Sequence, residues 1–503
     1  MAHPTDSIIA AMQTVTTEDK EVIRRAYDFA ERAHGEEKRK SGEPYIVHPH
    51  AIATYLATIG MDRDTIVAGI LHDTTEDTHV SLDEIEKEFG VTIRFLVDSL
   101  TKLSRLRYAG LERHVESLRH LLVATASDIR VIIIKMADRL HNMRTIEFVE
   151  PLEKRERIAR DTMEVYVPIA ERLGMGNIKA ELEDLAFSVL EPARYEDLTI
   201  TIKETTEEFN DKLEEDIRDL KRLLAENGIR TFRTEFRVKG VHSFAQKTAK
   251  YDGDISQVYD LFALRVVVKN TEECYRVLGI VHGLWRPIPG KVKDYLAFPK
   301  PNGYRSLHTT VITHRGVTVE LQIRTEEMHQ DAQFGVASHF GYKNRGFIKS
   351  NETASWIYSL IPSLKKYLPG NSTQSPRWLQ ELSAAEREHP DYENFEDILK
   401  KDFFAERIFA FTPKGDVIDL PRDATPIDFA YNIHSDVGDT MNGAKVNGKL
   451  VSLDTTLRNG DVVEITMSKN SHPNKKWLDI AKTVSAKAQI RAALRRSGTF
   501  ESN

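Results

Sequence analysis

The period of the hydrophobic pattern changes near residue 229, and this change constrains the fold more than any other feature of the sequence. Before it, apolar residues recur every three or four positions, and Val22, Ala26, Phe29 and Ala33 form one such stripe. After it, short runs rich in β-branched residues alternate with helical patterns. The change indicates an all-helical part followed by an α/β part, and we expect a multidomain protein.

Length and composition agree with several separate cores. The chain has 503 residues, and a domain typically takes about 100–200. A net charge of −7 provides no overall basic field, so any nucleic-acid-binding surface must be local. The single cysteine, Cys274, excludes an intramolecular disulfide and a thiolate metal cluster. No stretch approaches the roughly 20 apolar residues of a membrane span, and the N-terminus lacks a secretion signal. We therefore expect a cytoplasmic protein.

Turn signals and changes of composition divide the chain into six segments. In chain order we predict an all-helical domain (1–192), a helical connector (193–228), an α/β domain with a mixed sheet (229–345), a helical linker (346–403), a small β-rich module (404–467) and a basic helical tail (468–503). The predicted strands of the α/β domain are 231–238, 261–268, 307–313 and 317–323. In the module, strands are separated by turn signals that include Asn442-Gly443 and Asn447-Gly448.

The helical domain contains residue types that bind a divalent metal. His72 and Asp73 follow an apolar run on a predicted helix, and Glu76 lies four residues after His72, on the same face. Burying adjacent His and Asp side chains after an apolar run costs free energy unless they are paired, and one metal ion could pair with both. His48 and Asp138 supply further ligands. Such a set suits Mn²⁺, Fe²⁺ or Zn²⁺, whereas one histidine alone is more often a satisfied core residue.

The α/β domain contains acidic and basic residues suited to a polyphosphate. Polar and apolar residues alternate along 317–323, which places Glu320 and Gln322 on the polar face. Asp260 opens another predicted strand, and two acids on a sheet can hold Mg²⁺ for phosphoryl transfer. Because Asp260 and Arg265 differ in parity, both can face one site only if Asp260 precedes the regular strand or a bulge intervenes. Basic residues surround the acids and predict a phosphate cradle: Arg237, Lys239, Arg265, Lys291, Lys293, Lys300, Arg305 and Arg324. Any one of these alone is more often a solvated surface charge.

Four blocks of the helical domain resemble the hydrolase half of the RelA/SpoT homologue family, the enzymes of the alarmone (p)ppGpp, and also HD-type metal phosphohydrolases. The blocks are RKSGEPYIVHP (39–49), HDTTEDT (72–78), TKL (101–103) and KMADRLHNMRT (135–145). The resemblance implies one Mn²⁺ held by His48, His72, Asp73 and Asp138. It places Glu76 and Asp77 at the attacking water, Arg39 against the guanine, and Asn142 and Thr145 at the nucleoside. Because the chain keeps the HDxxED block, we expect hydrolase activity.

The α/β domain resembles the synthetase half of the same family and is similar to nucleotidyltransferases. The matching blocks are RVKGVHS (237–243), YDLFALRV (259–266), KVKDYLAFPKPNGYRSLHTT (291–310) and VELQIRTEEMH (319–329). The resemblance implies that Asp260 and Glu320 bind Mg²⁺ and that Glu320 takes the proton of the ribose 3′-hydroxyl of GDP or GTP. That oxygen then attacks the β-phosphorus of ATP, and AMP leaves.

The same resemblance assigns the remaining nucleotide contacts. Arg237 and Arg265 enclose adenine, Tyr304 stacks on guanine, and Asn302 reads its edge. The residues that bind phosphate would be Lys239, Ser243, Lys293, Lys300 and His308. Gln322 would lie in the same nucleotide site. Lys291-Val292-Lys293-Asp294 stands where Arg-Phe-Lys-Asp is common, which leaves the choice between GDP and GTP open.

The C-terminal module resembles the TGS domain, a β-grasp module also found in threonyl-tRNA synthetases. The resemblance implies that His434 meets uncharged tRNA on the ribosome; the alternative is a simple spacer. The tail has eight basic and two acidic residues, which suits either an RNA backbone or a solvated helical face. Family members continue with further regulatory domains, so we expect a chain truncated after the TGS domain.

The leading hypothesis is a bifunctional enzyme, a GTP pyrophosphokinase that makes (p)ppGpp and a guanosine-3′,5′-bis(diphosphate) 3′-pyrophosphohydrolase that degrades it. One alternative is a hydrolase with a silent synthetase domain, and the presence of both Asp260 and Glu320 disfavours it. Another is a tRNA-binding or ribosome-binding regulator, which the intact metal set disfavours. Since opposed reactions would run a futile cycle, we hypothesise a two-state hinge near Pro192–Asn227 through which one ordered site disfavours the other.

Overall fold

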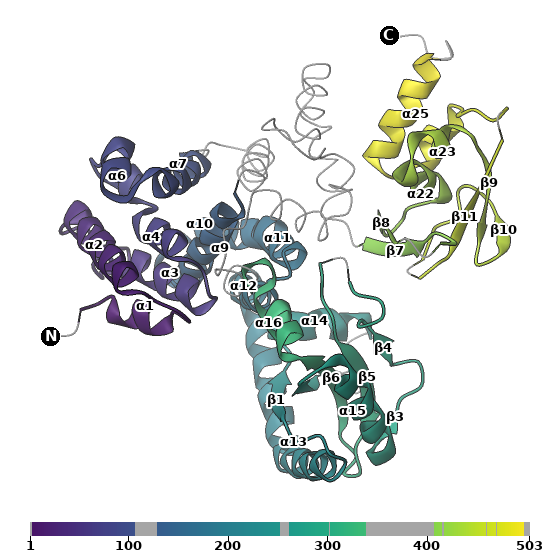
Figure 1. The fold of residues 1–503 in the computed structure, drawn as a ribbon, viewed down its shortest axis with the longest axis horizontal. Helices are drawn as coiled ribbons and strands as arrows, with labels where there is room; N and C mark the ends of the chain where they lie inside the picture. The colour runs from purple at the N-terminus through teal and green to yellow at the C-terminus, as the bar shows by residue number, and fades with distance from the viewer. Residues whose placement is uncertain are drawn as a thin grey trace. The chain divides into compact units, whose positions relative to one another are not determined.

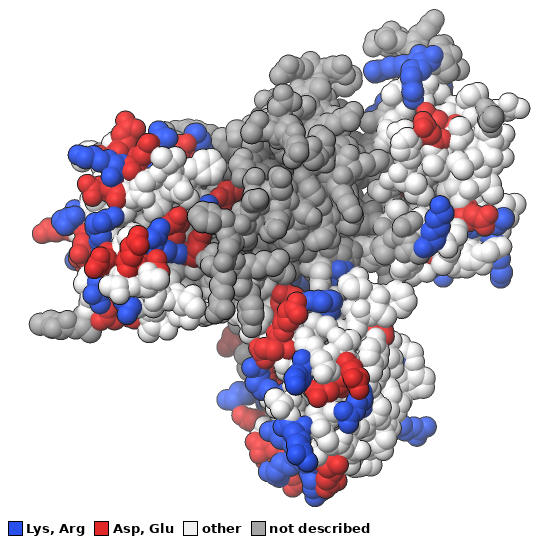
Figure 2. Space-filling model, viewed as in Figure 1, with Lys and Arg blue, Asp and Glu red and all other residues white. Residues whose placement is uncertain are grey.

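The computed structural model describes residues 3–105, 128–251, 261–300, 302–338, 407–414, 417–458, 460–468 and 470–496. The chain forms two compact units, of which the first holds the described residues up to 338 and the second those from 407 onward (Figure 1). No helix of the described part has the length and apolar character needed to cross a membrane. On the face shown in Figure 2, basic and acidic side chains are interspersed over the described helices.

The first unit begins with a layered set of helices. They are α1 (Asp6–Ala11), α2 (Thr17–His34), α3 (Val47–Thr58), α4 (Arg63–Leu71), α5 (Thr74–Asp77), α6 (Leu82–Phe89), α7 (Val91–Arg105), α9 (Ile129–Arg144), η1 (Ile146–Phe148), α10 (Leu152–Asp161), η2 (Thr162–Tyr166), α11 (Val167–Arg172) and α12 (Gly176–Leu190). Every residue of α4 from Thr65 to Leu71 is buried, as is the run 131–134 of α9. Runs of consecutive buried residues are typical of helices in the centre of a bundle, and α4 and α9 pack together.

Two local predictions for these helices are wrong in detail. The buried stripe of α2 consists of Ile23, Ala26, Tyr27, Ala30 and His34, about one position away from the predicted stripe. The predicted helix through the HDxxED block is broken, because α4 ends before His72 and α5 starts after Asp73. The ring of His72 bonds to the carbonyl of Gly69, and the carbonyl of Asp73 accepts from the N–H groups of the next short helix. Glu76 therefore lies on a separate short helix, α5, and not on the helix that ends before His72.

The α/β part of the first unit contains a six-stranded mixed sheet, which confirms the predicted fold class. Its elements are α13 (Pro192–Glu226), β1 (Phe232–Val238), α14 (Val241–Lys250), β2 (Phe262–Val268), α15 (Thr271–Leu284), β3 (Arg286–Pro287), β4 (Lys293–Asp294), β5 (Leu307–Ile312), β6 (Thr318–Thr325), α16 (Glu326–Phe334) and η4 (Gly335–Ala337). The strand order is β1-β2-β6-β5-β3, with β4 also paired to β5. Only β2 and β6 run parallel among the described strands.

Three helices cover one face of this sheet and leave the other for polar side chains. Leu220 of α13, Phe244 of α14 and Val277 of α15 are fully buried and share a core with Leu264 of β2 and Leu321 of β6. Because successive side chains of a strand point to opposite faces, the residues between these apolar ones face away from the core. The sheet therefore has one apolar face and one polar face.

The helical and α/β parts touch within the first unit. α12 contacts both α14 and α16. The N–H of Val336 donates to the carbonyl of Leu173 at 3.0 Å. Gly335 has φ +54°, and a Cβ at this position would collide with the carbonyl oxygen of Leu173. Glycine is therefore required here for both conformation and space.

The second unit contains two small sheets and four helices among its described residues. Its elements are β7 (Arg407–Phe411), β8 (Val417–Pro421), α22 (Pro426–Ile433), α23 (Ser435–Asp439), β9 (Met441–Val446), β10 (Lys449–Val451), β11 (Val463–Met467), α24 (Lys476–Ile480) and α25 (Val484–Arg496). Asn447-Gly448 forms the predicted turn between β9 and β10, with positive φ at both residues. The turn predicted at Asn442-Gly443 is wrong, because this pair lies inside β9, where Gly443 is paired with Thr466 of β11.

The basic segment after β11 packs onto this module. Ile490 and Leu494 of α25 share a core with Ile427 and Tyr431 of α22. The carboxylate of Asp428, which is buried, accepts hydrogen bonds at both helix starts, from Thr425 in α22 and from the backbone of residues 482 and 483 before α25. The apolar side of α25 thus packs against α22. The basic residues of α25, Arg491, Arg495 and Arg496, are exposed.

Candidate metal site and nucleotide-binding face

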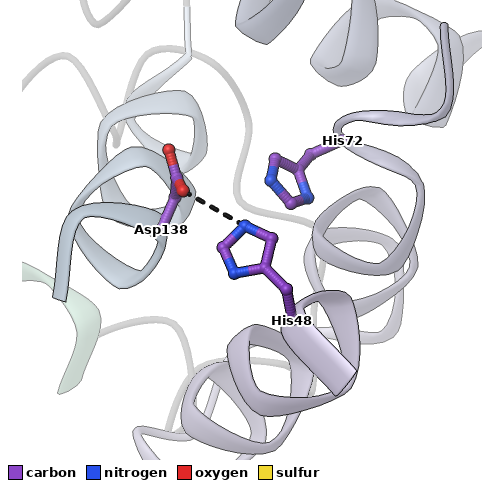
Figure 3. A group of neighbouring side chains, drawn as sticks. All are labelled: His48, His72 and Asp138. Carbon is purple, nitrogen blue, oxygen red and sulfur yellow. Dashed lines mark ion pairs between the residues drawn. The ribbon is translucent and has the colours of Figure 1, made fainter. Parts of the chain in front are cut away.

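Three buried side chains from three helices meet in the helical part. His48 lies on α3, His72 directly follows α4 and Asp138 lies on α9, and one donor atom from each falls within 4.8 Å of the others (Figure 3). The side chain of His48 faces Asp138, with 3.4 Å between Nε2 and Oδ1. All three residues are at most 6% exposed. Two imidazoles and a carboxylate in this arrangement fit a divalent metal ion.

The charges of this cluster are balanced by its neighbours. Lys135 lies 2.6 Å from one carboxylate oxygen of Asp138, and the amide of Asn142 donates to the other at 2.6 Å. Although burial opposes ionisation, Lys135 and His48 hold the pKa of Asp138 well below its usual range. Burial lowers the pKa of His72, but the adjacent Asp73 outweighs it and raises this pKa to about 9. Nδ1 of His72 bonds to a backbone carbonyl, so its buried Nε2 is directed into the cluster, toward the carboxylate of Asp73. A metal ion would take the place of the proton between them.

Asp73 borders the cluster. Its Oδ2 lies 2.9 Å from Nε2 of His72 and 3.5 Å from Nε2 of His48. The hydroxyl of Tyr45 lies 2.8 Å from a carboxylate oxygen of Asp73 and 2.8 Å from one of Asp77. The one hydroxyl proton of Tyr45 is shared between two carboxylates. Tyr45 therefore links Asp73, which borders the cluster, to Asp77, which is exposed on α5. Sequence reasoning missed Tyr45, although it lies only three residues before His48.

The predicted nucleoside contacts gather beside the cluster. The guanidinium of Arg39 donates to Asn142 at 3.2 Å and to Thr145 at 3.3 Å. It also contacts His141, whose Nδ1 lies 2.9 Å from Nδ1 of His48. Burial lowers the pKa of Arg39. Glu76 is half-buried on α5, the short helix that follows the break.

Strand register aligns the predicted synthetase residues on the polar face of the sheet. One row of neighbouring residues runs Glu235, Arg265, Gln322, His308 and Lys293 across β1, β2, β6, β5 and β4. The next row contains Arg237, Ala263, Glu320 and Thr310. Six predicted site residues therefore share one face, although they come from five strands.

Glu320 lies at the centre of this face and is held as an anion. Its carboxylate contacts Nδ1 of His308 at 3.2 Å and accepts from the amide of Gln322 at 3.0 Å. Burial alone would raise the pKa of Glu320, but these two neighbours lower it to about 2. The hydroxyl of Tyr304 lies 2.7 Å from Nε2 of His308, which continues the network toward the loop before β5.

The loop before β5 brings Lys300, Asn302 and Tyr304 together. The backbone N–H of Lys300 donates to the carbonyl of Tyr304, and the N–H of Tyr304 donates to the side chain of Asn302. The ammonium of Lys300 lies 5.3 Å from the centre of the Tyr304 ring. The amide of Asn302 also donates to the carbonyl of Glu171 in the helical part at 3.1 Å.

Cations on this side of the sheet repel one another. Burial and the neighbouring Arg265 lower the pKa of Arg237, and burial lowers that of Lys239. Lys247 lies on α14, one helical turn after Ser243, where burial and Lys239 lower its pKa to about 7. Sequence reasoning missed Lys247, although its spacing of four from Ser243 places both on one side of a helix.

Two predicted site residues remain, of which one is not described and the other lies in the second unit. Asp260 is outside the described residues, and β2 begins after it, at Phe262. His434, in the second unit, is exposed, and its Nδ1 accepts from the backbone N–H of Asp436 at 3.1 Å. This bond caps the short helix α23, so the imidazole has a local structural role.

An all-helical domain with a buried histidine and carboxylate cluster, followed by a mixed sheet with a cationic face, defines a multidomain protein of the HD class. Comparison with family models agrees. An HD domain matches residues 26–176, the region found in RelA / SpoT proteins matches 236–346, and a TGS domain matches 408–467.

Curated relatives match most of the chain. A probable guanosine-3′,5′-bis(diphosphate) 3′-pyrophosphohydrolase of Synechocystis sp. is 43% identical over 96% of this chain and 62% of its own length. A GTP pyrophosphokinase of Streptomyces coelicolor is 43% identical over 93% of this chain and 55% of its own. The bifunctional (p)ppGpp synthase/hydrolase SpoT of Escherichia coli is 39% identical over 97% of this chain and 67% of its own. The chain therefore belongs to the RelA/SpoT family, as predicted, and it spans between about half and two thirds of the length of these relatives.

Proposed function

We propose that this protein both synthesises and hydrolyses (p)ppGpp, with the hydrolase site in the helical domain (1–192) and the synthetase site in the α/β domain (229–345). The observation that carries the proposal is the presence of two separate sites of different chemistry in one chain. One is the buried cluster of His48, His72 and Asp138, and the other is the cationic sheet face around Glu320. Family membership and the activities for which the relatives are named support both halves.

In the hydrolase half, His48, His72, Asp73 and Asp138 would hold Mn²⁺. The bound metal would make water a stronger nucleophile and polarise a phosphoryl oxygen. Glu76 or Asp77 would accept the proton of the attacking water, with Asp77 oriented by Tyr45. Arg39, Asn142 and Thr145 would hold the nucleoside, and the products would be GDP or GTP and pyrophosphate.

In the synthetase half, Asp260 and Glu320 would hold Mg²⁺, which offsets the negative charge that moves between phosphate oxygens. Arg237 and Arg265 would enclose adenine, and Tyr304 would stack on guanine with Asn302 at its edge. The phosphates of ATP would lie against Lys239, Ser243, Lys247, Lys293, Lys300 and His308. The ribose 3′-oxygen of GDP or GTP would form a bond to the β-phosphorus of ATP, and the bond to the α-phosphate oxygen would break to release AMP.

The environment of Glu320 sets a condition on its role as a base. A carboxylate with a pKa of about 2 accepts a proton poorly. A substrate that displaces His308 from Glu320 would raise this pKa and so make Glu320 a stronger base toward the 3′-hydroxyl. Gln322 would keep the carboxylate oriented during the exchange.

The second unit would serve regulation. We propose that the TGS module, with His434 on its surface, contacts uncharged tRNA on the ribosome in the cytoplasm. The exposed basic residues of α25 would lie against the RNA backbone.

The proposal is tested by incubating the purified chain with labelled ATP and GDP in Mg²⁺, and separately with labelled ppGpp in Mn²⁺. We expect AMP and ppGpp in the first reaction and pyrophosphate in the second. Asp73→Ala should lower hydrolysis at least about a thousandfold and leave synthesis intact, and Glu320→Ala should do the reverse. Hydrolysis without synthesis would identify a silent synthetase domain, and neither activity would favour a tRNA-binding or ribosome-binding regulator.

A further inference from the structure

The helix that carries Ser243 and Lys247 begins without a capping side chain of its own. α14 starts after Gly240, which has φ −60° and ψ 151° and offers no side-chain acceptor. The first N–H groups of any helix lack partners within the helix, and a side chain usually accepts one of them. The acceptor for α14 must therefore come from another element.

Asp184 of α12 supplies this acceptor from the helical part of the molecule. Its Oδ1 accepts from the backbone N–H of His242 at 2.9 Å, and its carboxylate also accepts from the N–H of Val241. A negative charge at the start of a helix is additionally favoured by the helix dipole. Asp184 of the helical part thus caps α14 of the α/β part, across the contact between α12 and α14.

Gly240 provides the space for this cap. A Cβ at Gly240 would lie 2.7 Å from Oδ2 and 3.1 Å from Oδ1 of Asp184. Its φ of −60° is open to every residue, so the backbone conformation does not require glycine. The requirement is steric, since the carboxylate could not move aside without leaving the N–H groups that it accepts from.

We propose that Asp184 is a positioning residue of the synthetase site, which fixes the first turn of α14 from the helical part and thereby sets the phosphate-binding groups around it. Lys239 directly precedes the cap, Ser243 lies in the first turn and Lys247 lies one turn later. The inference rests on the proposed function, in which these three residues hold the phosphates of ATP. Guanine binding and the metal cluster involve other elements and do not depend on this cap.

The test compares Asp184→Ala, Asp184→Asn and Gly240→Ala in the full chain. Loss of a helix cap destabilises the first turn of the helix, which carries phosphate-binding groups. Asp184→Ala should therefore weaken ATP binding and raise the KM for ATP about five- to tenfold. The KM for GDP and the hydrolysis of ppGpp should stay within twofold of wild type. Asp184→Asn keeps a neutral acceptor and should recover most of the affinity. Gly240→Ala should reproduce the effect of Asp184→Ala, and the double variant should be no worse than either.

A matched control and a binding measurement complete the test. Glu181→Ala removes a carboxylate three residues earlier on α12, one that pairs with Arg144, and should leave the KM for ATP unchanged. Titration calorimetry with a non-reactive ATP analogue should show the same fold-change in Kd without any turnover. If the wild type forms no ppGpp, the proposed function fails while this titration still tests the cap. An unchanged Kd in Asp184→Ala, or equal losses for ATP, GDP and hydrolysis, would overturn the inference.

Discussion

The metal cluster of the helical part and the polar face of the sheet handle buried charge in opposite ways. In the cluster, acids alternate with cations, and Asp138 contacts both Lys135 and His48. On the sheet, cations lie beside cations, and the pKa values of Arg237, Lys239 and Lys247 are all lowered. The first site is already close to neutral and would gain a small cation with its ligands in place. The second has excess positive charge that a polyphosphate would neutralise, so its stability and its affinity for anions oppose each other.

The largest predicted effect is a difference in the free energy of unfolding between a variant of the metal cluster and a variant of the sheet face. Lys135→Met should destabilise the chain by about 3 kcal/mol, because it leaves Asp138 buried without its amine partner. Arg324 of β6 is buried, and its guanidinium contacts Nδ1 of His329 at 3.0 Å. Burial and Arg265 lower its pKa to about 10, so Arg324→Met should change stability by no more than about 1 kcal/mol. Urea unfolding in chelator measures both variants. Equal destabilisation by the two substitutions would contradict the contrast.

A smaller effect concerns the pH dependence of nucleotide binding. Lys247, with a pKa of about 7 in the free protein, is mostly neutral above pH 7 and should become protonated when a polyphosphate binds. Binding then takes up a proton, so the affinity for a non-reactive ATP analogue should fall as pH rises from 7.5 to 9, by up to about tenfold per unit. Calorimetry in two buffers of different ionisation enthalpy measures the proton directly. Lys247→Gln should abolish the uptake, and persistence of the uptake in this variant would assign it to another group.

The smallest effect concerns communication between the sites. The connector is one unbroken helix, α13, so a hinge would have to lie at its ends. α12 touches both sides, since Glu181 pairs with Arg144 of α9 and Asp184 caps α14. A non-reactive ATP analogue should slow Mn²⁺-dependent ppGpp hydrolysis about fivefold in the wild type. An unchanged hydrolysis rate in the presence of the analogue would contradict coupling between the two sites.

Patterns that act over a few residues could be predicted from the sequence. The alternation along β6 placed Glu320 and Gln322 on one face, and register then aligned Arg265 and His308 beside them. Interactions that depend on distant contacts could not be predicted in the same way. Pairing with β11 overrides the turn signal of Asn442-Gly443, and the helix break at His72 depends on local backbone bonding that periodicity does not describe.

The residues that sequence reasoning missed share one property, which is that the role of each depends on contacts with other elements of the fold. Tyr45 bonds to two acids, Lys247 adds to a cation group, and Asp184 caps a helix far from it in the chain. None of them stands out by type, because Tyr, Lys and Asp are common in structural roles. Their partners become visible only when the elements are folded together.

The central claim is that the two sites use separate residues to bind different kinds of ligand, and titration of Mn²⁺ into metal-free protein tests it most directly. We expect one Mn²⁺ per chain bound in wild type and in Glu320→Gln with the same Kd, and loss of this binding in Asp138→Asn. Retained binding in Asp138→Asn, or its loss in Glu320→Gln, would contradict the account.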